Sequence, residues 1–170
     1  QRSLVGSEMC IRDRGQPWKT QEWTRRLLDE MYQPTPEGII GNEDCGQMSA
    51  WYILSSLGFY SVCPGSNQFI LTTPLFDKAN MKLGNGKTLV ITANQPDKNK
   101  YITKVTLNGE EISHCYITYD QLMQGGTLDF TLSATPDKRW GTAPEYAPYS
   151  YTEQPTVSIP YIAVSYTHLT

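Results

Sequence analysis

The sequence has no run of eighteen or more apolar residues, and this absence excludes a transmembrane helix of ordinary length. It also has no cluster of basic residues, since 14 Lys and Arg face 17 Asp and Glu for a formal net charge of -3. Nucleic acids and anionic lipid surfaces recruit basic patches. We therefore expect no nucleic-acid partner and no membrane insertion.

Cysteine is scarce as well. The chain has four Cys, and no two of them have the Cys-X-X-Cys spacing of a zinc site. Cys10 falls in a segment set aside below, which leaves Cys45, Cys63 and Cys115. An odd number does not define a disulfide framework, so buried free thiols are expected ahead of a Cys45–Cys63 bridge, which stays open.

The two ends of the chain are related at the level of codons. Met9–Asp13 can be encoded by a DNA string whose reverse complement encodes Val164–His168. A folded protein has no physical reason for this relation, whereas a sequencing adapter translated at both ends of a DNA fragment produces it. We expect residues 1–14 and 163–170 to be adapter-derived and without a role in fold or function.

A first helix is predicted from Thr20, its N-cap, to about Tyr32. Its apolar residues recur at helical spacing and are expected to pack inward, with the charged residues on the opposite face. The stripe consists of Trp23, Leu27, Leu28 and Met31. Trp18, in the loop before the cap, is the candidate sugar-facing aromatic residue, and simple packing within that loop is the alternative.

Three polar residues, Asn42, Glu43 and Asp44, stand before a second predicted helix. Asp44 is expected to cap this helix, which is apolar on nearly every face and stops at Gly58. A carboxylate at the positive end of a helix dipole stays ionised, as a general base or a hard-cation ligand must. A cap that only stabilises the helix is the alternative for Asp44.

The second half of the chain has the alternating pattern of β-strands. Short apolar strands in residues 64–141 are separated by Asn85-Gly86, a primed hairpin turn, and by a second Asn-Gly turn at Asn108-Gly109, which predicts an antiparallel β-sandwich. The Pro- and Tyr-rich residues 142–162 are expected to be extended and weakly structured. The fold class is therefore α+β, with a helical hairpin in residues 15–63 before the sandwich.

Several motifs resemble glycoside hydrolase family 92, the calcium-dependent exo-acting α-mannosidases. The longest is GNEDCGQMSAWY, and it is followed by LGFYSVCPGS and PLFDKA. Shorter matches are Gln16–Gln21, Asn108-Gly109 and Trp140-Gly141, so the similarity covers about residues 15 to 141. The resemblance implies that residues 15–63 end an (α/α)6 toroidal catalytic domain and that residues 64–141 form a C-terminal β-sandwich.

The resemblance also implies a reaction and a site. The reaction is inverting hydrolysis of terminal α-linked mannose from glycans, with Asp44 as the general base and Asn42 in support. Asn42 and Asp44 are implied as part of a calcium shell, the role of Glu43 is uncertain, and Trp18 is a candidate for binding substrate. Periplasmic or secreted localisation is implied as well.

The general acid of the family has no counterpart in this sequence, so this chain alone is expected to be inactive and to need the rest of a longer protein as its partner. Three alternatives stay open: a non-catalytic β-sandwich accessory domain, a carbohydrate-binding module, and another (α/α)6 glycosidase.

Overall fold

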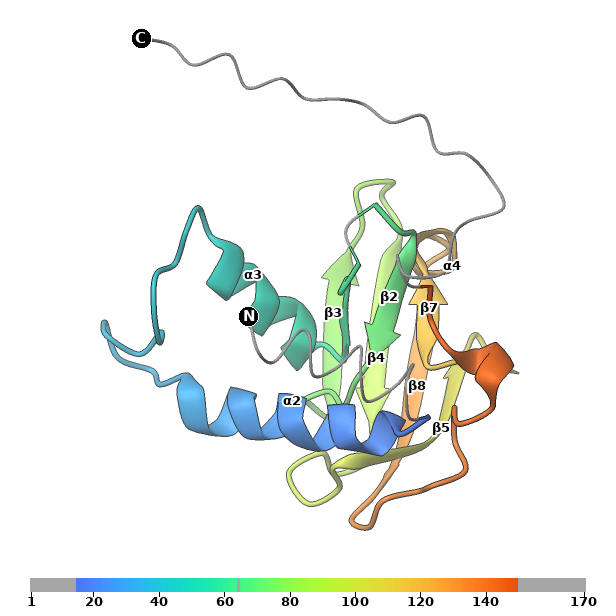
Figure 1. Cartoon of the computed structure of the whole chain (residues 1–170). Coiled ribbons are helices and arrows are strands. Elements are labelled where there is room, and N and C mark those ends of the chain that lie inside the picture. The colour runs from blue at the N-terminus through green and yellow to red at the C-terminus, as the bar shows by residue number, and fades with distance from the viewer. Residues whose placement is uncertain (1–14, 64, 150–170) are drawn as a thin grey trace, which may run out of the picture.

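The computed structural model describes residues 15–63 and 65–149, and these ranges form a mixed α+β fold (Figure 1). Within them two helices come first, and two β-sheets follow with one short helix between their strands. No helix in the described part is long and apolar enough to cross a membrane. The expectations for residues 1–14, 150–162 and 163–170 lie outside the described residues.

The first described helix, α2 (Pro17–Met31), begins three residues before the predicted cap at Thr20. Pro17 occupies its first turn, where the fixed φ of proline suits the helix and the missing N–H has no partner to lose. Gln16 is the N-cap residue. Thr20 therefore lies inside the helix, 1% exposed, and the predicted cap is wrong.

The buried face of helix α2 carries polar residues in addition to Leu28 from the predicted apolar stripe. Gln21 is 1% exposed, and its Oε1 accepts a hydrogen bond from the Ile102 N–H at 3.0 Å. Arg25 is also buried, and its guanidinium donates to a backbone carbonyl 49 residues away at 3.3 Å. Trp23 and Met31 are exposed instead. Leu28 of the predicted stripe is buried, and Arg26, Asp29 and Glu30 are exposed as predicted. The predicted orientation is therefore wrong only in part, at Trp23, Met31 and Arg25, and the buried polar side chains have partners.

Helix α3 (Gln47–Ser56) ends as predicted. Its C-cap is Leu57, and Gly58 follows with φ +96. A Cβ at Gly58 would also lie 2.8 Å from a ring carbon of Pro74, so the position requires glycine for space as well as for conformation. The prediction that this helix is covered on every face is wrong within the described residues, because Ile53 is 55% exposed.

The strands form two sheets that are joined by one core. One sheet has the order β1-β2-β7 and the other the order β3-β4-β8-β5-β6. The strands are β1 (Phe59–Tyr60), β2 (Gln68–Leu71), β3 (Lys78–Lys82), β4 (Thr88–Ala93), β5 (Tyr101–Leu107), β6 (Glu110–Glu111), β7 (Tyr116–Thr118) and β8 (Gly126–Ser133). Alternating residues of both sheets are buried together, among them Leu71 and Ile117 from one and Ile91, Val105 and Phe130 from the other.

Strands β4 and β8 pair in parallel, with Leu89 opposite Gly126 and Ala93 opposite Phe130. The other strand pairs of the described residues are antiparallel. The predicted wholly antiparallel arrangement is wrong at this one pair. A parallel pair needs a long crossover, and the chain between β4 and β8 fills it with β5, β6, β7 and the short helix α4 (Tyr119–Met123).

The two Asn-Gly turns differ. Asn108 and Gly109 have φ +53 and +89, the two positive values that a type I′ turn requires between β5 and β6. At Asn85-Gly86 only the glycine has a positive φ, +82, so the predicted primed turn is wrong there. The Asn85 side chain donates instead to the Met123 carbonyl at 2.7 Å, which holds this loop against the end of α4.

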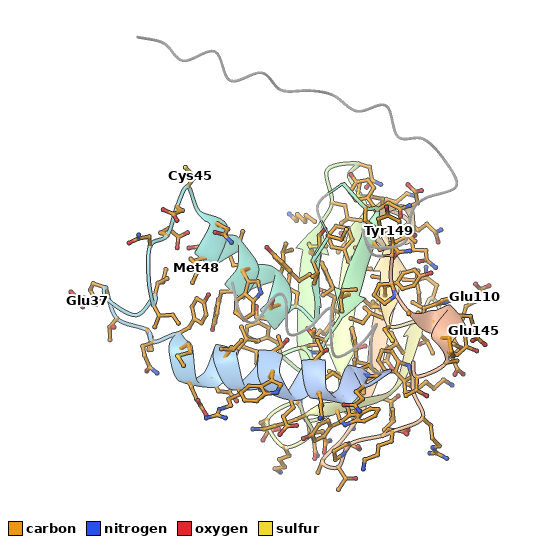
Figure 2. The ribbon with its side chains drawn as sticks, in the orientation of Figure 1. Glu37, Cys45, Met48, Glu110, Glu145 and Tyr149 are labelled. Carbon is orange, nitrogen blue, oxygen red and sulfur yellow. The ribbon has the colours of Figure 1, made fainter. Side chains whose placement is uncertain are left out.

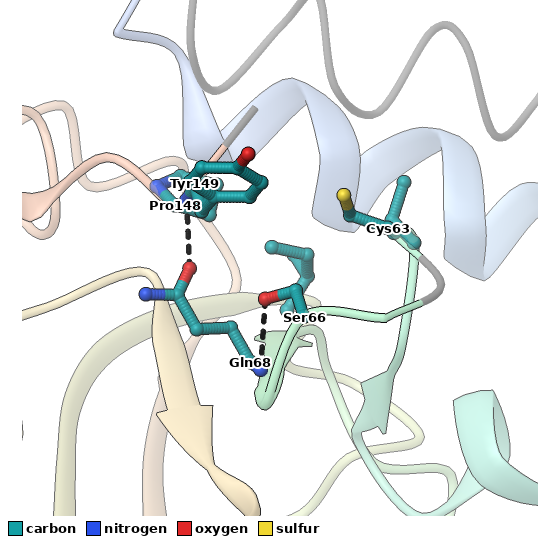
Figure 3. Close-up of a pocket in the computed structure, with 7 residues that line it drawn as sticks. Cys63, Ser66, Gln68, Pro148 and Tyr149 are labelled. Atoms are coloured by element: carbon teal, nitrogen blue, oxygen red, sulfur yellow. Dashed lines mark hydrogen bonds between the residues drawn. The ribbon is translucent and has the colours of Figure 1, made fainter. Parts of the chain in front are cut away.

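The start of the predicted extended segment is docked on the sheets. Residues Pro144–Tyr146 form the 3-10 turn η2, and the Tyr146 carbonyl accepts from the Cys115 N–H at 3.2 Å. Farther on, the Tyr149 N–H donates to the side-chain oxygen of Gln68 at 2.7 Å (Figure 3). The hollow beside this contact holds about 10 Å³, and its walls are apolar side chains and the polar groups of Ser66 and Gln68. Weak structure is therefore wrong for residues 142–149.

Two glycines at strand ends provide a test of this packing. Gly126→Ala would place a Cβ on the Asn108 side chain, whose Oδ1 accepts from the Thr127 N–H at 2.8 Å. We expect it to lower the free energy of unfolding by about 3 kcal/mol through overpacking and left-handed strain. Gly109→Ala, with a similar φ and open space around it, should cost only about 1 kcal/mol. Equal losses in urea unfolding of the two variants would contradict the packing described.

Candidate functional site

The loop before α3 contains an unusual backbone. Asp44, Cys45 and Gly46 have φ values of +40, +61 and +86, which makes three consecutive left-handed residues, and Gly41 has φ +81. The N-cap position of α3 is Gly46, and no side chain caps it from that position. Asp44 is therefore not the helix cap, and this prediction is wrong. The left-handed run reverses the chain between Asp44 and the first turn of the helix.

Asn42 and Asp44 are both exposed on this loop, with Glu43 between them. Cys45 lies at the tip of the loop, and Met48 follows on the first turn of α3 (Figure 2). An exposed carboxylate beside an exposed amide can accept a proton from water and hold that water by a hydrogen bond. The residues of the predicted site are thus accessible, although neither lines the groove described below.

Glu43 makes the hydrogen bonds to the first turn of α3 that Asp44 was expected to make. Its carbonyl accepts from the Gln47 N–H at 3.0 Å, and its side-chain Oε1 accepts from the Ser49 N–H at 3.1 Å. Its other carboxylate oxygen is buried and has no hydrogen-bond partner within the described residues. Glu43 therefore satisfies donors of the first turn of α3 from a position before the left-handed run.

A groove of about 560 Å³ separates the end of α2 from α3. Tyr32 and Tyr52 line it, with their ring centroids 4.8 Å apart, and Trp51 stacks on Tyr32 at 5.6 Å. Burial, and then the charge of Glu43, raises the pKa of Tyr32 above its ordinary value. Sequence reasoning missed this aromatic cluster. Trp51 and Tyr52 belong to the helix that was predicted to be apolar on nearly every face, and nothing local pairs them with Tyr32, which stands at the end of the preceding helix.

Trp18 is not part of this site. It is a half-buried residue of the first turn of α2, rather than of a loop as predicted. The candidate loop follows the other end of that helix, and at 1.5 Å per residue the helix separates Trp18 from Met31 by roughly 20 Å. The structure therefore does not bring Trp18 and Asp44 together.

Metal binding needs more ligands than the loop provides. Among the described residues, no group of three or more His, Cys, Asp or Glu side chains is placed to hold a metal ion. Calcium takes six to eight oxygen ligands, and the side chains of Asn42 and Asp44 offer oxygens of the right kind. The side chains of Asn42 and Asp44 alone would leave most of these positions unfilled.

The three cysteines of the described part form no disulfide. Cys45 is exposed on the candidate loop, whereas Cys115 is buried and its Sγ donates to the Gly141 carbonyl at 2.7 Å. Burial raises the pKa of the Cys115 thiol to about 12. Cys115 is thus a packing residue.

Comparison with known proteins identifies the kind of domain to which these features belong. The model of the glycosyl hydrolase family 92 catalytic domain matches residues 13–134. A protein described as an uncharacterized secreted glycosidase from Arthroderma benhamiae is 29% identical over 140 residues, which are 80% of this chain and 18% of that protein.

Solved structures show the same similarity. The family GH92 inverting mannosidase BT2199 from Bacteroides thetaiotaomicron is 43% identical, with a TM-score of 0.74, over 82% of this chain and 19% of its own. The GH92 α-mannosidase BT3965 from the same organism was solved in complex with mannoimidazole. It is 34% identical, with a TM-score of 0.78, over 88% of this chain and 19% of its own. This chain therefore spans about a fifth of the length of the relatives it matches.

Thiol labelling tests the exposure of the loop. At pH 8, iodoacetamide should modify Cys45 and leave Cys115 unmodified, because a thiol with a pKa near 12 has only about one thiolate in ten thousand at that pH. Peptide mass spectrometry of the folded chain gives each site separately, and labelling in guanidinium should modify both. Equal modification of the two residues in the folded chain would contradict the structure.

Proposed function

Because this chain belongs to glycosyl hydrolase family 92, we propose that it supplies part of the catalytic region of an inverting exo-α-mannosidase that acts on terminal α-linked mannose of glycans. The observation that carries the proposal is the exposed Asn42–Asp44 loop at the start of α3, inside the segment that the family model matches. Two structural relatives are described as mannosidases, one of them as inverting.

The proposed chemistry assigns Asp44 to the water. Inverting hydrolysis needs one carboxylate that takes a proton from water and one carboxylic acid that gives a proton to the leaving oxygen. As the water oxygen bonds to the anomeric carbon, its proton passes to Asp44 and the glycosidic bond breaks. Asn42, two residues before Asp44, orients the water through its side-chain amide. The acid comes from a part of the longer protein beyond this chain, which is therefore inactive alone.

Calcium belongs to the same proposal. The amide oxygen of Asn42 and the carboxylate of Asp44 would supply part of the oxygen shell, and the preceding part of the longer protein would complete it. The donor type supports this assignment, and the site is proposed to be shared because no group of three or more such ligand side chains is found among the described residues. Hydrolysis as written above uses only groups of this chain and the missing acid.

The helices support a toroidal catalytic domain. Helices α2 and α3 run in roughly opposite directions and are joined by residues 32–46, which include the candidate loop (Figure 1). Large apolar side chains stay exposed on the pair and its loop: Trp23, Met31, Ile39, Ile40 and Ile53. Exposed apolar side chains on a helix pair are available for contact with a further element. We assign it to neighbouring helices of an (α/α)6 toroid, which the rest of the longer protein would provide.

The β region is assigned a supporting role. Its two sheets share one apolar core, which favours a β-sandwich that buttresses the helical domain. A carbohydrate-binding module would need a row of exposed aromatic rings on one sheet face. Among the large apolar residues of this region, only Phe76 and Tyr119 are exposed, and they lie outside the strands. Secretion is proposed from the relative described as secreted.

The function is tested in the protein extended to the length of its relatives. It should release mannose from an α-mannoside, and Asp44→Asn should lower kcat at least 1000-fold, roughly the contribution of a general base. Glu37→Gln, a control on the exposed loop after α2, should leave kcat unchanged. The 170-residue chain alone should show no turnover.

Activity of the 170-residue chain, or full activity of the Asp44→Asn enzyme, would refute the proposal. Removal of calcium with a chelator and its return to the extended protein separates the metal assignment from the base assignment. Activity that is lost with the chelator and restored by Ca²⁺ supports the shared calcium shell. Activity that persists without calcium would refute the calcium assignment and leave the assignment of Asp44 as the base intact.

A further inference from the structure

The backbone of the candidate loop is costly to maintain. Asp44 and Cys45 are not glycine, yet both adopt left-handed φ values. Each such residue costs about 1–2 kcal/mol, and strained conformations persist only where their surroundings determine them. Some group outside the run must therefore hold the residues on either side of it together.

Glu43 is placed to do this. It precedes the left-handed run, and three of its contacts lie beyond it. Its carbonyl accepts from Gln47 at 3.0 Å and from Met48 at 3.5 Å, and its Oε1 accepts from the Ser49 N–H at 3.1 Å. These amides are among the donors that have no partner within a helix, and a negative charge near them is favoured by the helix dipole.

Glu43 differs from its two neighbours in burial. Glu43 is half-buried, whereas Asn42 and Asp44 on either side are exposed. The same three-residue stretch thus directs one side chain inward and two outward. Gly46 permits this chiefly by conformation, since a Cβ there would meet the Glu43 Oε1 only at an ordinary 3.8 Å.

We propose that Glu43 is a positioning residue, whose bridge to the first turn of α3 fixes the strained loop and presents Asn42 and Asp44 to the reacting water. The proposal deepens the proposed function and rests on it for the identity of the reaction. Glu43 touches neither water nor sugar in this role. It acts through the backbone that carries its neighbours.

The bridge is tested first in the 170-residue chain, without any assay of activity. Glu43→Ala should speed hydrogen exchange at the Ser49 amide about tenfold and shift the amide resonances of Asn42 and Asp44. Glu43→Gln keeps an acceptor oxygen and should retain most of the protection. It should still lower the pKa of Tyr32, because the charge that opposes the tyrosinate is gone. The control Glu37→Ala should leave the exchange rate at Ser49, the two amide resonances and the pKa of Tyr32 unchanged.

The role in catalysis is tested in the extended protein. Glu43→Ala should lower kcat about 100-fold with a smaller change in KM, as expected when a reacting group is misplaced, and Glu43→Gln should restore most of the rate. Full activity of the Glu43→Ala enzyme would overturn the proposal. So would exchange at Ser49 that quickens while the resonances of Asn42 and Asp44 stay unchanged, since Glu43 would then cap the helix and nothing more.

The two proposals fail in different ways. If the extended wild-type protein has no mannosidase activity, the proposed function falls, while the exchange and resonance measurements still decide whether Glu43 sets the loop. If the wild-type protein is active and the Glu43→Ala resonances match those of the wild type, the positioning role alone is overturned.

Discussion

The contact on which the arrangement depends is the hydrogen bond from the Ile102 N–H to the buried side chain of Gln21. It ties the helical part of the chain to strand β5 through a group that water cannot reach, because Gln21 is 1% exposed. Breaking one partner of such a pair leaves a buried polar group unsatisfied, at a cost of about 1–3 kcal/mol. This bond therefore fixes which face of α2 meets the sheets, and the opposite face, with Trp23, is left for another partner.

That choice of face explains why the sequence predicted the helix but misplaced part of its surface: Leu28 is buried as expected, whereas Trp23 and Met31 are exposed. The spacing of Trp23, Leu27 and Met31 reveals that α2 has an apolar side, and it does not reveal which neighbour covers each side. In a helix between two layers, both faces have partners, and the polar face can be the one packed on the sheet when Gln21 and Arg25 find buried acceptors and donors. Only the three-dimensional position of β5 supplies that information.

Local signals succeeded where the physics is local. Gly58 ends α3 and Asn108-Gly109 turns the chain between β5 and β6, because each depends on conformations that few residues tolerate. The parallel pairing of β4 with β8 was out of reach by the same reasoning. This pairing depends on which strand completes the core after a crossover of three strands and a helix, and no local turn motif predicts it.

The candidate site combines both cases. The polar block was visible in the sequence, and its two bounding glycines, Gly41 and Gly46, both take the left-handed conformation that glycine permits. The sequence did not reveal that Glu43, rather than Asp44, bonds the first turn of α3. Asp and Glu both suit a helix terminus, and the longer Glu43 side chain can reach Ser49 from before a left-handed run that leaves the Asp44 side chain exposed. A side chain that bonds the amides of the helix is committed to them, so Asp44, which is exposed, is the one of the two that stays accessible to solvent.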